Sequence, residues 1–217
     1  MRVHEGFVIG IDVQAVRDCP FAVLDASSRI VDSGWIATAG IGTSVQALSG
    51  SYPDAVFAID APRMALPTSR AWYWRNKRWG EATGNEVGNG RHCEVVIAAH
   101  RLANPQWTPL ANVAPEWMQH GFTIFDALRG RAQTLEVFPS ASYRMLSATN
   151  ELRVDMPLSG FLPGPKDMLD AVVAALTGME FLAGRGQEVG GGDGLGTIVL
   201  PRPIANPIDA VLRWPGC

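Results

Sequence analysis

Residues 7–12 read Phe-Val-Ile-Gly-Ile-Asp, and residues 55–60 read Ala-Val-Phe-Ala-Ile-Asp. Each run is apolar up to its last residue, which is typical of a short strand buried on both faces of a sheet. The two runs therefore predict two buried strands, each of which ends in a carboxylate. If the strands are adjacent and parallel, Asp12 and Asp60 lie within several ångströms of each other, and a cation is required to relieve their mutual repulsion.

The segments around these runs predict a mixed sheet with helices. Residues 19–25 and 29–37 predict two strands joined by a turn, so the first three strands form an antiparallel meander. The other expected elements are a helix within 43–48, a strand over 134–138, a helix over 140–146, the clearest helix over 167–182 and a last short strand over 197–200. Three antiparallel strands followed by parallel strands with helical crossovers is the ribonuclease H-like order. We therefore expect an α/β fold with a mixed five-stranded sheet flanked by helices.

The length of the chain fits a single domain over residues 1–217. Residues 63–131 are the least regular part of this domain. They hold five of the seven tryptophans and the main cluster of basic residues. We expect this segment to be an insertion with short helices and irregular structure that covers one end of the sheet.

The composition excludes several classes of protein. A chain that is 47% hydrophobic and only 18% charged is not disordered, and a net charge of −3 excludes a globally basic nucleic-acid coat. The three widely spaced cysteines fit neither a disulfide framework nor a zinc site, and they suit a reducing cytoplasm. The most apolar late stretch, 171–184, is too short and too charged to span a bilayer, so we expect a cytoplasmic protein without membrane association. The oligomeric state is left open.

Five carboxylates are candidates for chemistry. Besides Asp12 and Asp60, Glu136 lies near the end of the strand expected over 134–138. Asp167 and Asp170 share one face in the first turn of the late helix, whose other side chains are apolar and must pack on the sheet. Oxygen ligands of this kind suit Mg²⁺ or Mn²⁺, and two such ions about 4 Å apart would stabilise the attacking and leaving oxygens in phosphodiester cleavage.

Two of these acids have a plainer alternative role. Asp167 would cap its own helix, and Glu136 would pair with an arginine such as Arg131 or Arg144. A single acid at a strand end is commonly a turn former or a cap. The conjunction of all five acids in this order of elements is what indicates a metal site.

A second signal lies in residues 69–79, where cations alternate with aromatic rings. Trp74, Arg75 and Arg78 have the composition of a platform on which bases stack and phosphates are held. The alternative is a helix whose tryptophans pack inward while the arginines are solvated. Arg91 also has two interpretations: it holds a substrate phosphate, which we favour, or it forms a local ion pair with Glu94.

Short segments of the chain resemble a known family, the predicted ribonuclease H-like nucleases catalogued as domain-of-unknown-function family four-twenty-nine. The matching segments are Gly10-Ile11-Asp12, Ala58-Ile59-Asp60-Ala61-Pro62, Arg91-His92-Cys93-Glu94, Glu136-Val137-Phe138-Pro139-Ser140, Lys166-Asp167-Met168-Leu169-Asp170-Ala171 and a glycine-rich closing segment over 194–201. They follow the family's order and cover nearly the whole chain. Each segment alone is weakly specific, and the set is fairly specific.

This resemblance implies a ribonuclease H-like fold and metal-dependent nuclease activity on DNA or RNA. The superfamily places acids on the first strand, the fourth strand and a late helix, which here are Asp12, Asp60 and Asp170. These three would bind one or two Mg²⁺ or Mn²⁺ ions. Asp167 occupies a helper position, and Glu136 belongs to the family's own Glu-Val-Phe-Pro motif.

Three other functions are compatible with parts of the sequence. One is a non-catalytic module that binds nucleic acid or another ligand on the same fold, and another is hydrolysis of a small phosphorylated metabolite. The third is an actin-like or sugar-kinase-type phosphotransferase. That class needs glycines after the first acid to wrap phosphates in backbone N–H groups, and residues 13–17 contain none.

Overall fold

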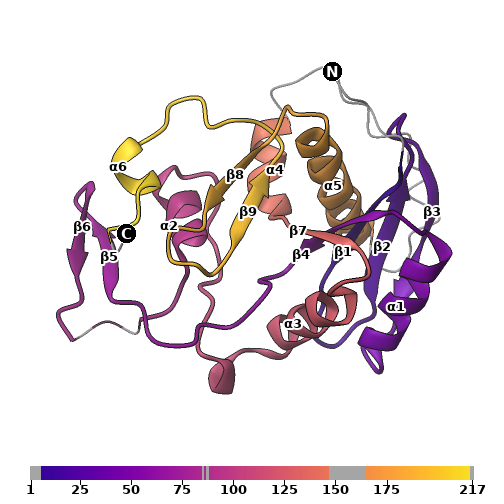
Figure 1. Ribbon diagram of the computed structural model, residues 1–217, viewed down its shortest axis with the longest axis horizontal. Coiled ribbons are helices and arrows are strands. Elements are labelled where there is room, and N and C mark those ends of the chain that lie inside the picture. Colours follow the sequence, from indigo (N-terminus) through magenta and orange to yellow (C-terminus); the bar gives the residue numbers. More distant parts are fainter. Residues whose placement is uncertain (1–5, 85, 87, 147–164, 216–217) are drawn as a thin grey trace.

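The computed structural model of the protein describes residues 6–84, 86, 88–146 and 165–215. Its centre is a mixed five-stranded sheet with the order β3-β2-β1-β4-β7 (Figure 1). Strand β2 pairs antiparallel with both β1 and β3, whereas β4 pairs parallel with β1 and β7 pairs parallel with β4. The strands are β1 (Val8–Asp12), β2 (Cys19–Leu24), β3 (Ile30–Ile36), β4 (Val56–Asp60) and β7 (Gln133–Glu136). The α/β class and the mixed five-stranded sheet expected from the sequence are confirmed.

Helices cover both faces of this sheet (Figure 1). Side chains alternate along β1, so Val8 packs in the core under α5 while Ile9 and Ile11 pack in the core under α1 and α3. Among the described residues, no helix is both long enough and apolar enough to cross a membrane. The helices are α1 (Ile41–Ser51), α3 (Glu116–Leu128), α4 (Pro139–Leu146), which packs on α5, and α5 (Pro165–Leu182).

A second, smaller core lies beside the sheet and joins distant parts of the chain. Its buried residues come from α2, α4, β8 and β9 and include Cys93, Ile97, Val189 and Leu200. An isolated bridge between Val137 and Val199 ties this part to the end of β7. The additional elements are β5 (Trp72–Arg75), β6 (Arg78–Glu81), α2 (His92–Ala99), β8 (Gln187–Gly190), β9 (Thr197–Leu200) and α6 (Asp209–Leu212).

Residues 63–131, expected as one insertion, serve two different parts of the fold. Helix α2 belongs to the second core, whereas α3 returns to cover the central sheet. The helix considered for residues 69–79 is wrong, because this segment is the hairpin β5–β6. Asn76 and Lys77 both have positive φ angles in its two-residue turn, which matches the right-handed twist of the flanking strands.

Helix α5 approaches the sheet most closely at Gly10. A Cβ atom added to Gly10 would lie 1.9 Å from the backbone carbonyl oxygen of Ala171, so only glycine allows the helix to pack at this distance. Gly10 is two residues before Asp12, and Ala171 directly follows Asp170. The contact therefore sets how closely the acids of β1 and α5 approach each other.

We expect Gly10→Ala to lower the free energy of unfolding by about 3 kcal/mol or more, because the clash is with helix backbone that cannot move independently. Urea denaturation at pH 6 measures this change. Gly50→Ala is the matched control, since nothing lies within 4 Å of its added Cβ and Gly50 is an exposed position in α1. The control should be neutral or slightly stabilising. Equal stabilities for both variants would contradict the proposed role of Gly10.

Candidate functional site

The carboxylates of Asp12 and Asp60 come together at one edge of the sheet. They are the last residues of β1 and β4 and are directly paired in the parallel register of these strands. Because side chains alternate along a strand, both project to the face on which α5 packs. Asp12 is only 6% exposed, and Asp60 is half-buried. The adjacency expected from the two apolar runs is therefore present.

Helix α5 adds Asp167 and Asp170 to this edge, as the spacing of the two acids predicts. The hydroxyl of Tyr143 donates to Oδ1 of Asp170 at 2.8 Å, and Nζ of Lys166 donates to Oδ2 at 2.5 Å. Asp167 instead forms an ion pair with the exposed Arg17, at 2.9 Å. Both acids of α5 are thus held by cations from the surface.

The acids destabilise one another in their charged forms. Burial, followed by the nearby charge of Asp170, raises the pKa of Asp12 from 3.8 to about 7, although a hydrogen bond from Nε2 of Gln14 opposes the shift. Burial, followed by the charges of Asp12 and Asp170, raises the pKa of Asp60 well above its usual value. The pKa of Tyr143 also rises, through burial and its hydrogen bond to Asp170.

The donor set at this edge fits a divalent cation. No described residue donates a hydrogen bond to the carboxylate of Asp60, and Asp12 receives a hydrogen bond only from Gln14. Clustered, desolvated carboxylates of this kind are suited to Mg²⁺ or Mn²⁺. Within the described ranges, however, no three His, Cys, Asp or Glu side chains form a ready-made metal site. Binding would require Asp170 to exchange Lys166, which is 79% exposed, for the metal.

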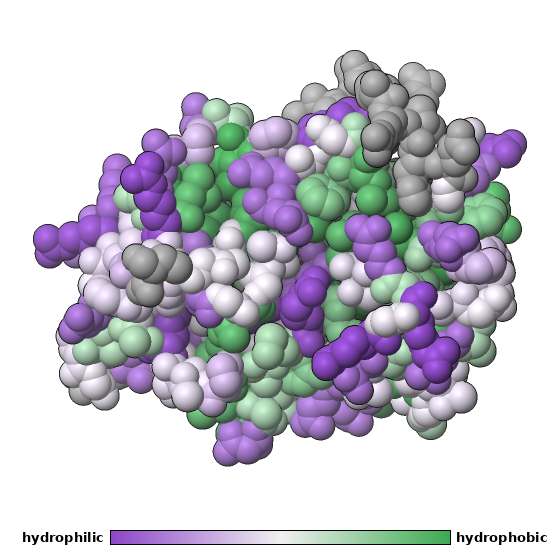
Figure 2. All heavy atoms as spheres, viewed as in Figure 1, coloured by the Kyte–Doolittle hydropathy of each residue, from purple (hydrophilic) through white to green (hydrophobic). Residues whose placement is uncertain are grey.

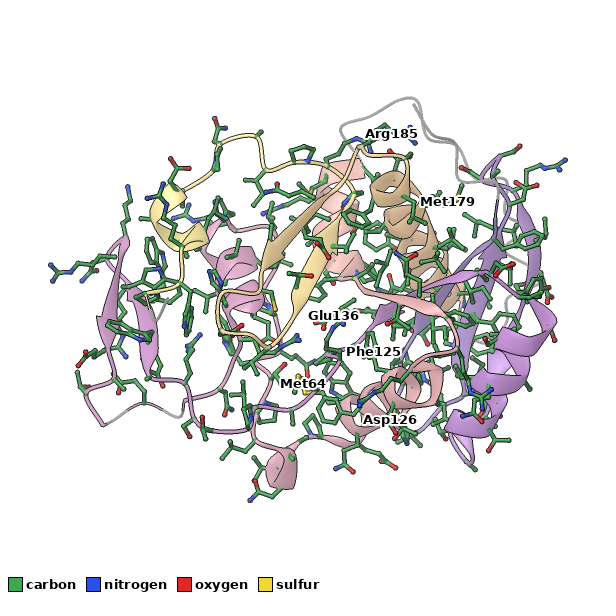
Figure 3. All side chains as sticks on the ribbon, viewed as in Figure 1. Met64, Phe125, Asp126, Glu136, Met179 and Arg185 are labelled. Atoms are coloured by element: carbon green, nitrogen blue, oxygen red, sulfur yellow. The ribbon has the colours of Figure 1, made fainter. Side chains whose placement is uncertain are left out.

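Glu136 lies on the opposite face of the sheet from the other acids. It pairs with Ile59 in the register of β4 and β7, whereas its neighbour Leu135 pairs with Ala58 and packs under α5. Figure 3 shows Glu136 at the end of β7, near the middle of the molecule. The side-chain carboxylate of Glu136 accepts a hydrogen bond from the backbone N–H of Arg63 at 3.0 Å. Its charge still contributes to the raised pKa of Asp60.

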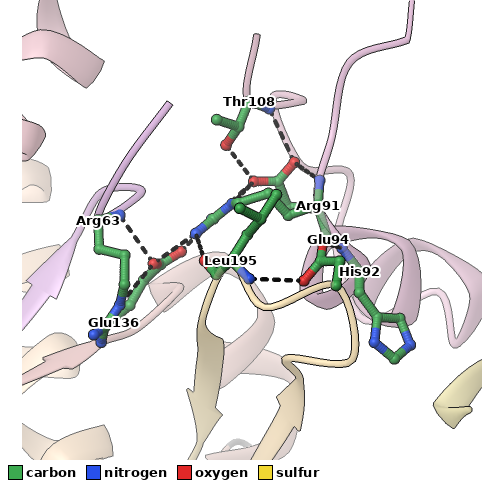
Figure 4. Close-up of polar contacts among 8 residues, drawn as sticks. Arg63, Arg91, His92, Glu94, Thr108, Glu136 and Leu195 are labelled. Atoms are coloured by element: carbon green, nitrogen blue, oxygen red, sulfur yellow. Dashed lines mark hydrogen bonds and ion pairs between the residues drawn. The ribbon is translucent and has the colours of Figure 1, made fainter. Parts of the chain in front are cut away.

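The main partner of Glu136 is Arg91, which is 1% exposed (Figure 4). The guanidinium of Arg91 donates to both carboxylate oxygens of Glu136 and, through Nε and Nη2, to Oε1 of Glu94. Its Nη1 also lies 3.5 Å from the carbonyl oxygen of Leu195. Glu94 accepts further hydrogen bonds from the N–H and hydroxyl of Thr108.

This buried network contains the ion pair that is one of the two interpretations of Arg91. The ion pair with Glu94 is present, and every N–H direction of the guanidinium is already occupied by a protein acceptor. Binding a substrate phosphate would require one of these contacts to break. Glu136 pairs with an arginine, as one interpretation of the sequence had it, but the partner is Arg91 and neither Arg131 nor Arg144. The sequence did not indicate this pair, because the two residues are 45 positions apart.

The residues proposed as a stacking platform lie on the hairpin β5–β6. The rings of Trp74 and Trp79 meet edge to face at 5.4 Å, and Trp79 also contacts the rings of His92 and Trp214. Arg75 pairs with Glu86, and Arg78 is exposed. None of Trp74, Arg75 and Arg78 lines the cavity beside the acids.

That cavity has a volume of about 410 Å³ and opens next to Asp60. In the middle of the face drawn in Figure 2, hydrophilic atoms lie between hydrophobic ones, over the place where β7, β9 and α3 meet in Figure 1. Part of the cavity wall lies in the segments 58–62 and 136–140, which the sequence analysis already names. The rest comes from loops and a helix start without a periodic signal, so the sequence did not indicate it. The wall residues that the sequence did not indicate include Gln14, Asn104, Gln106 and Trp117.

The raised pKa of Asp12 makes the stability of the metal-free protein depend on pH. The native state binds a proton that the unfolded state has lost, so the free energy of unfolding falls as pH rises from about 4 to about 7. We expect Asp12→Asn to raise this free energy by about 2 kcal/mol at pH 8 and to change it little at pH 4. Urea denaturation in EDTA at both pH values measures the effect, and an equal effect at both would refute the assignment.

We expect Arg91→Met to lower the free energy of unfolding by about 3–5 kcal/mol, because it leaves two buried carboxylates without their cation. Thermal and urea denaturation measure the loss. The matched control is Arg29→Met, which removes an exposed ion pair with Asp25 and should cost less than about 1 kcal/mol. A loss for Arg91→Met no larger than that of the control would show that the network does not hold this edge together.

Comparisons with known proteins do not add to this picture. No family model matches the chain, and searches of curated proteins and of solved structures found no match.

Proposed function

We propose that the protein is a metal-dependent nuclease of the ribonuclease H-like type, related to the family that its segments resemble. The observation that carries the proposal is the register pair Asp12–Asp60 at the carboxyl ends of two parallel strands, faced by Asp170 from α5. Two of these carboxyl groups have raised pKa values, and Asp60 has no protein donor among the described residues. Such a cluster is costly for the fold unless a cation is bound.

The sheet supports the same proposal independently of the acids. The order β3-β2-β1-β4-β7, with antiparallel pairing among the first three strands and parallel pairing beyond, is the order expected for ribonuclease H-like proteins. In this arrangement the acids of the first and fourth strands become neighbours at one edge. The late helix α5 crosses β1 at Gly10 and adds a third acid at the same edge.

The side chains have distinct roles in this proposal. Asp12, Asp60 and Asp170 hold one or two Mg²⁺ or Mn²⁺ ions, which would activate a water molecule for attack on phosphorus and neutralise charge on the phosphate. Asp12 and Asp60 must lose their protons for this, and a nearby dication favours the charged forms. Tyr143 orients Asp170 through its hydrogen bond. Lys166, once displaced from Asp170, is an exposed cation beside the substrate phosphate.

Glu136 and Arg91 act differently from the acids on the α5 face. Both are buried and bound to each other, so we assign them the positioning of the loop after β4 through the Arg63 N–H rather than contact with the metal. Asp167 remains a helper residue, because its ion pair with Arg17 can exchange at the surface.

Calorimetric titration with Mn²⁺ at pH 7.5 tests the metal site directly. We expect the wild type to bind Mn²⁺ with micromolar affinity. We expect the affinity to fall at least a hundredfold in Asp12→Asn and in Asp60→Asn, because each substitution removes one charged ligand. Asp126→Asn is the control, because Asp126 is 74% exposed and forms an ion pair with Arg129 at the surface. Binding that survives in Asp60→Asn would contradict the proposed site.

The nuclease activity is tested separately with labelled single-stranded and duplex oligonucleotides in Mn²⁺, Mg²⁺ or EDTA. We expect cleavage only with metal and none by Asp12→Asn. Metal binding without cleavage of any nucleic acid would favour the non-catalytic module on the same fold.

A further inference from the structure

The cavity beside Asp60 lies at the junction of the sheet edge with three loops. Its wall is formed by the ends of β1, β4 and β7, by residues 104–106 and by the start of α3. Asp60 belongs both to this wall and to the acid cluster on the α5 face. A molecule in the cavity therefore lies directly beside the proposed metal site.

The charges in the wall argue against an anionic occupant. Its carboxylates are Asp60, Glu94 and Glu136, and its cation among the described residues is Arg91. The guanidinium of Arg91 is already saturated by Glu94 and Glu136. A phosphate inside the cavity would meet three carboxyl groups and no available cation, so the group that enters should be uncharged.

The remaining wall suits a flat, polar group. Trp117 and Phe138 contribute aromatic surface, on which a planar ring can stack. Asn104 and Gln106 contribute exposed amide side chains, each with donors and an acceptor that no other described residue engages. This combination of ring surface and amides is the chemistry that recognises the edge and the face of a nucleobase.

A shallow polar depression adjoins the cavity and differs from it in charge. It shares Asn104 and Ser140 with the cavity wall, and it adds Arg101 and Arg144. The side chain of Arg101 is exposed, and its backbone carbonyl accepts a hydrogen bond from Arg144. A surface with two arginines therefore begins where the cavity with its acidic wall ends, which suits the phosphate that follows a bound base.

We propose that the cavity receives one unpaired nucleobase of the substrate, with the adjoining phosphates directed to the acid cluster on one side and to the depression at Arg101 on the other. The substrate class is then single-stranded nucleic acid or a free nucleotide rather than a continuous duplex, because a stacked and paired base cannot enter the cavity. The inference rests on the proposed nuclease function for the fate of the phosphate. Binding of the base itself requires no metal.

The test is to titrate the protein, in the presence of EDTA, with the four common nucleosides and with their monophosphates. Calorimetry and tryptophan fluorescence measure the binding. We expect millimolar or tighter binding of at least one base, weakened about tenfold or more in the double variant Asn104→Ala/Gln106→Ala. Both positions are exposed, so this variant should fold normally. Trp107→Leu is the control, because Trp107 is 38% exposed and stacks on Arg70 outside the cavity wall.

The inference would be overturned if no base binds at millimolar concentration, or if the double variant leaves the binding unchanged. Competition with oligonucleotides provides a second arm, in which a single strand should displace the base and a blunt duplex of equal length should not. Equal competition by the duplex would also overturn it. The nucleoside titrations contain EDTA and therefore do not depend on a bound metal. Absence of nucleoside binding would leave the Mn²⁺ site standing, and absence of Mn²⁺ binding would leave the nucleobase site standing.

Discussion

The structure depends on the placement of Asp12 and Asp60 at the ends of two adjacent, buried, parallel strands. Buried charges of like sign are costly, so this arrangement holds only if the carboxyl groups stay protonated or gain a cation. The raised pKa values of both groups express that cost. The surrounding elements limit it: Gln14 donates to Asp12, and Lys166 and Arg17 bring positive charge to the acids of α5. Much of the rest of the edge is arranged around these two carboxylates.

The opposite face of the same edge solves a similar problem by internal pairing. Glu136 and Glu94 are both buried, but Arg91 lies between them and donates to each. Here the counter-ion is part of the chain, so no ligand is needed to balance the charge. The contrast between the two faces separates an ion network with its own counter-ion from a cluster that is balanced only by protonation or by a cation. The two lie close together, because Glu136 pairs in register with Ile59, the residue directly before Asp60.

Local patterns were sufficient to predict the central sheet and the acids on its α5 face. The apolar runs before Asp12 and Asp60 indicate buried strands, and the spacing of Asp167 and Asp170 places both on one helix face. The face occupied by Glu136 could not be predicted, because it depends on the register of β7 against β4. A shift of one residue would have placed Glu136 with the other acids.

The hairpin β5–β6 and the cavity wall show a different limit. Within residues 69–79 the aromatic and basic residues suit a helix and a strand equally well, and the deciding feature is a turn with positive φ at Asn76 and Lys77. The cavity wall is built from loops such as 104–106, which have no periodicity and meet the sheet edge only after folding. Local patterns therefore indicate where the charge lies, whereas tertiary structure decides which uncharged groups surround it. Under the proposed function, the carboxylates at the sheet edge determine the reaction, and the uncharged residues of the cavity wall determine the substrate.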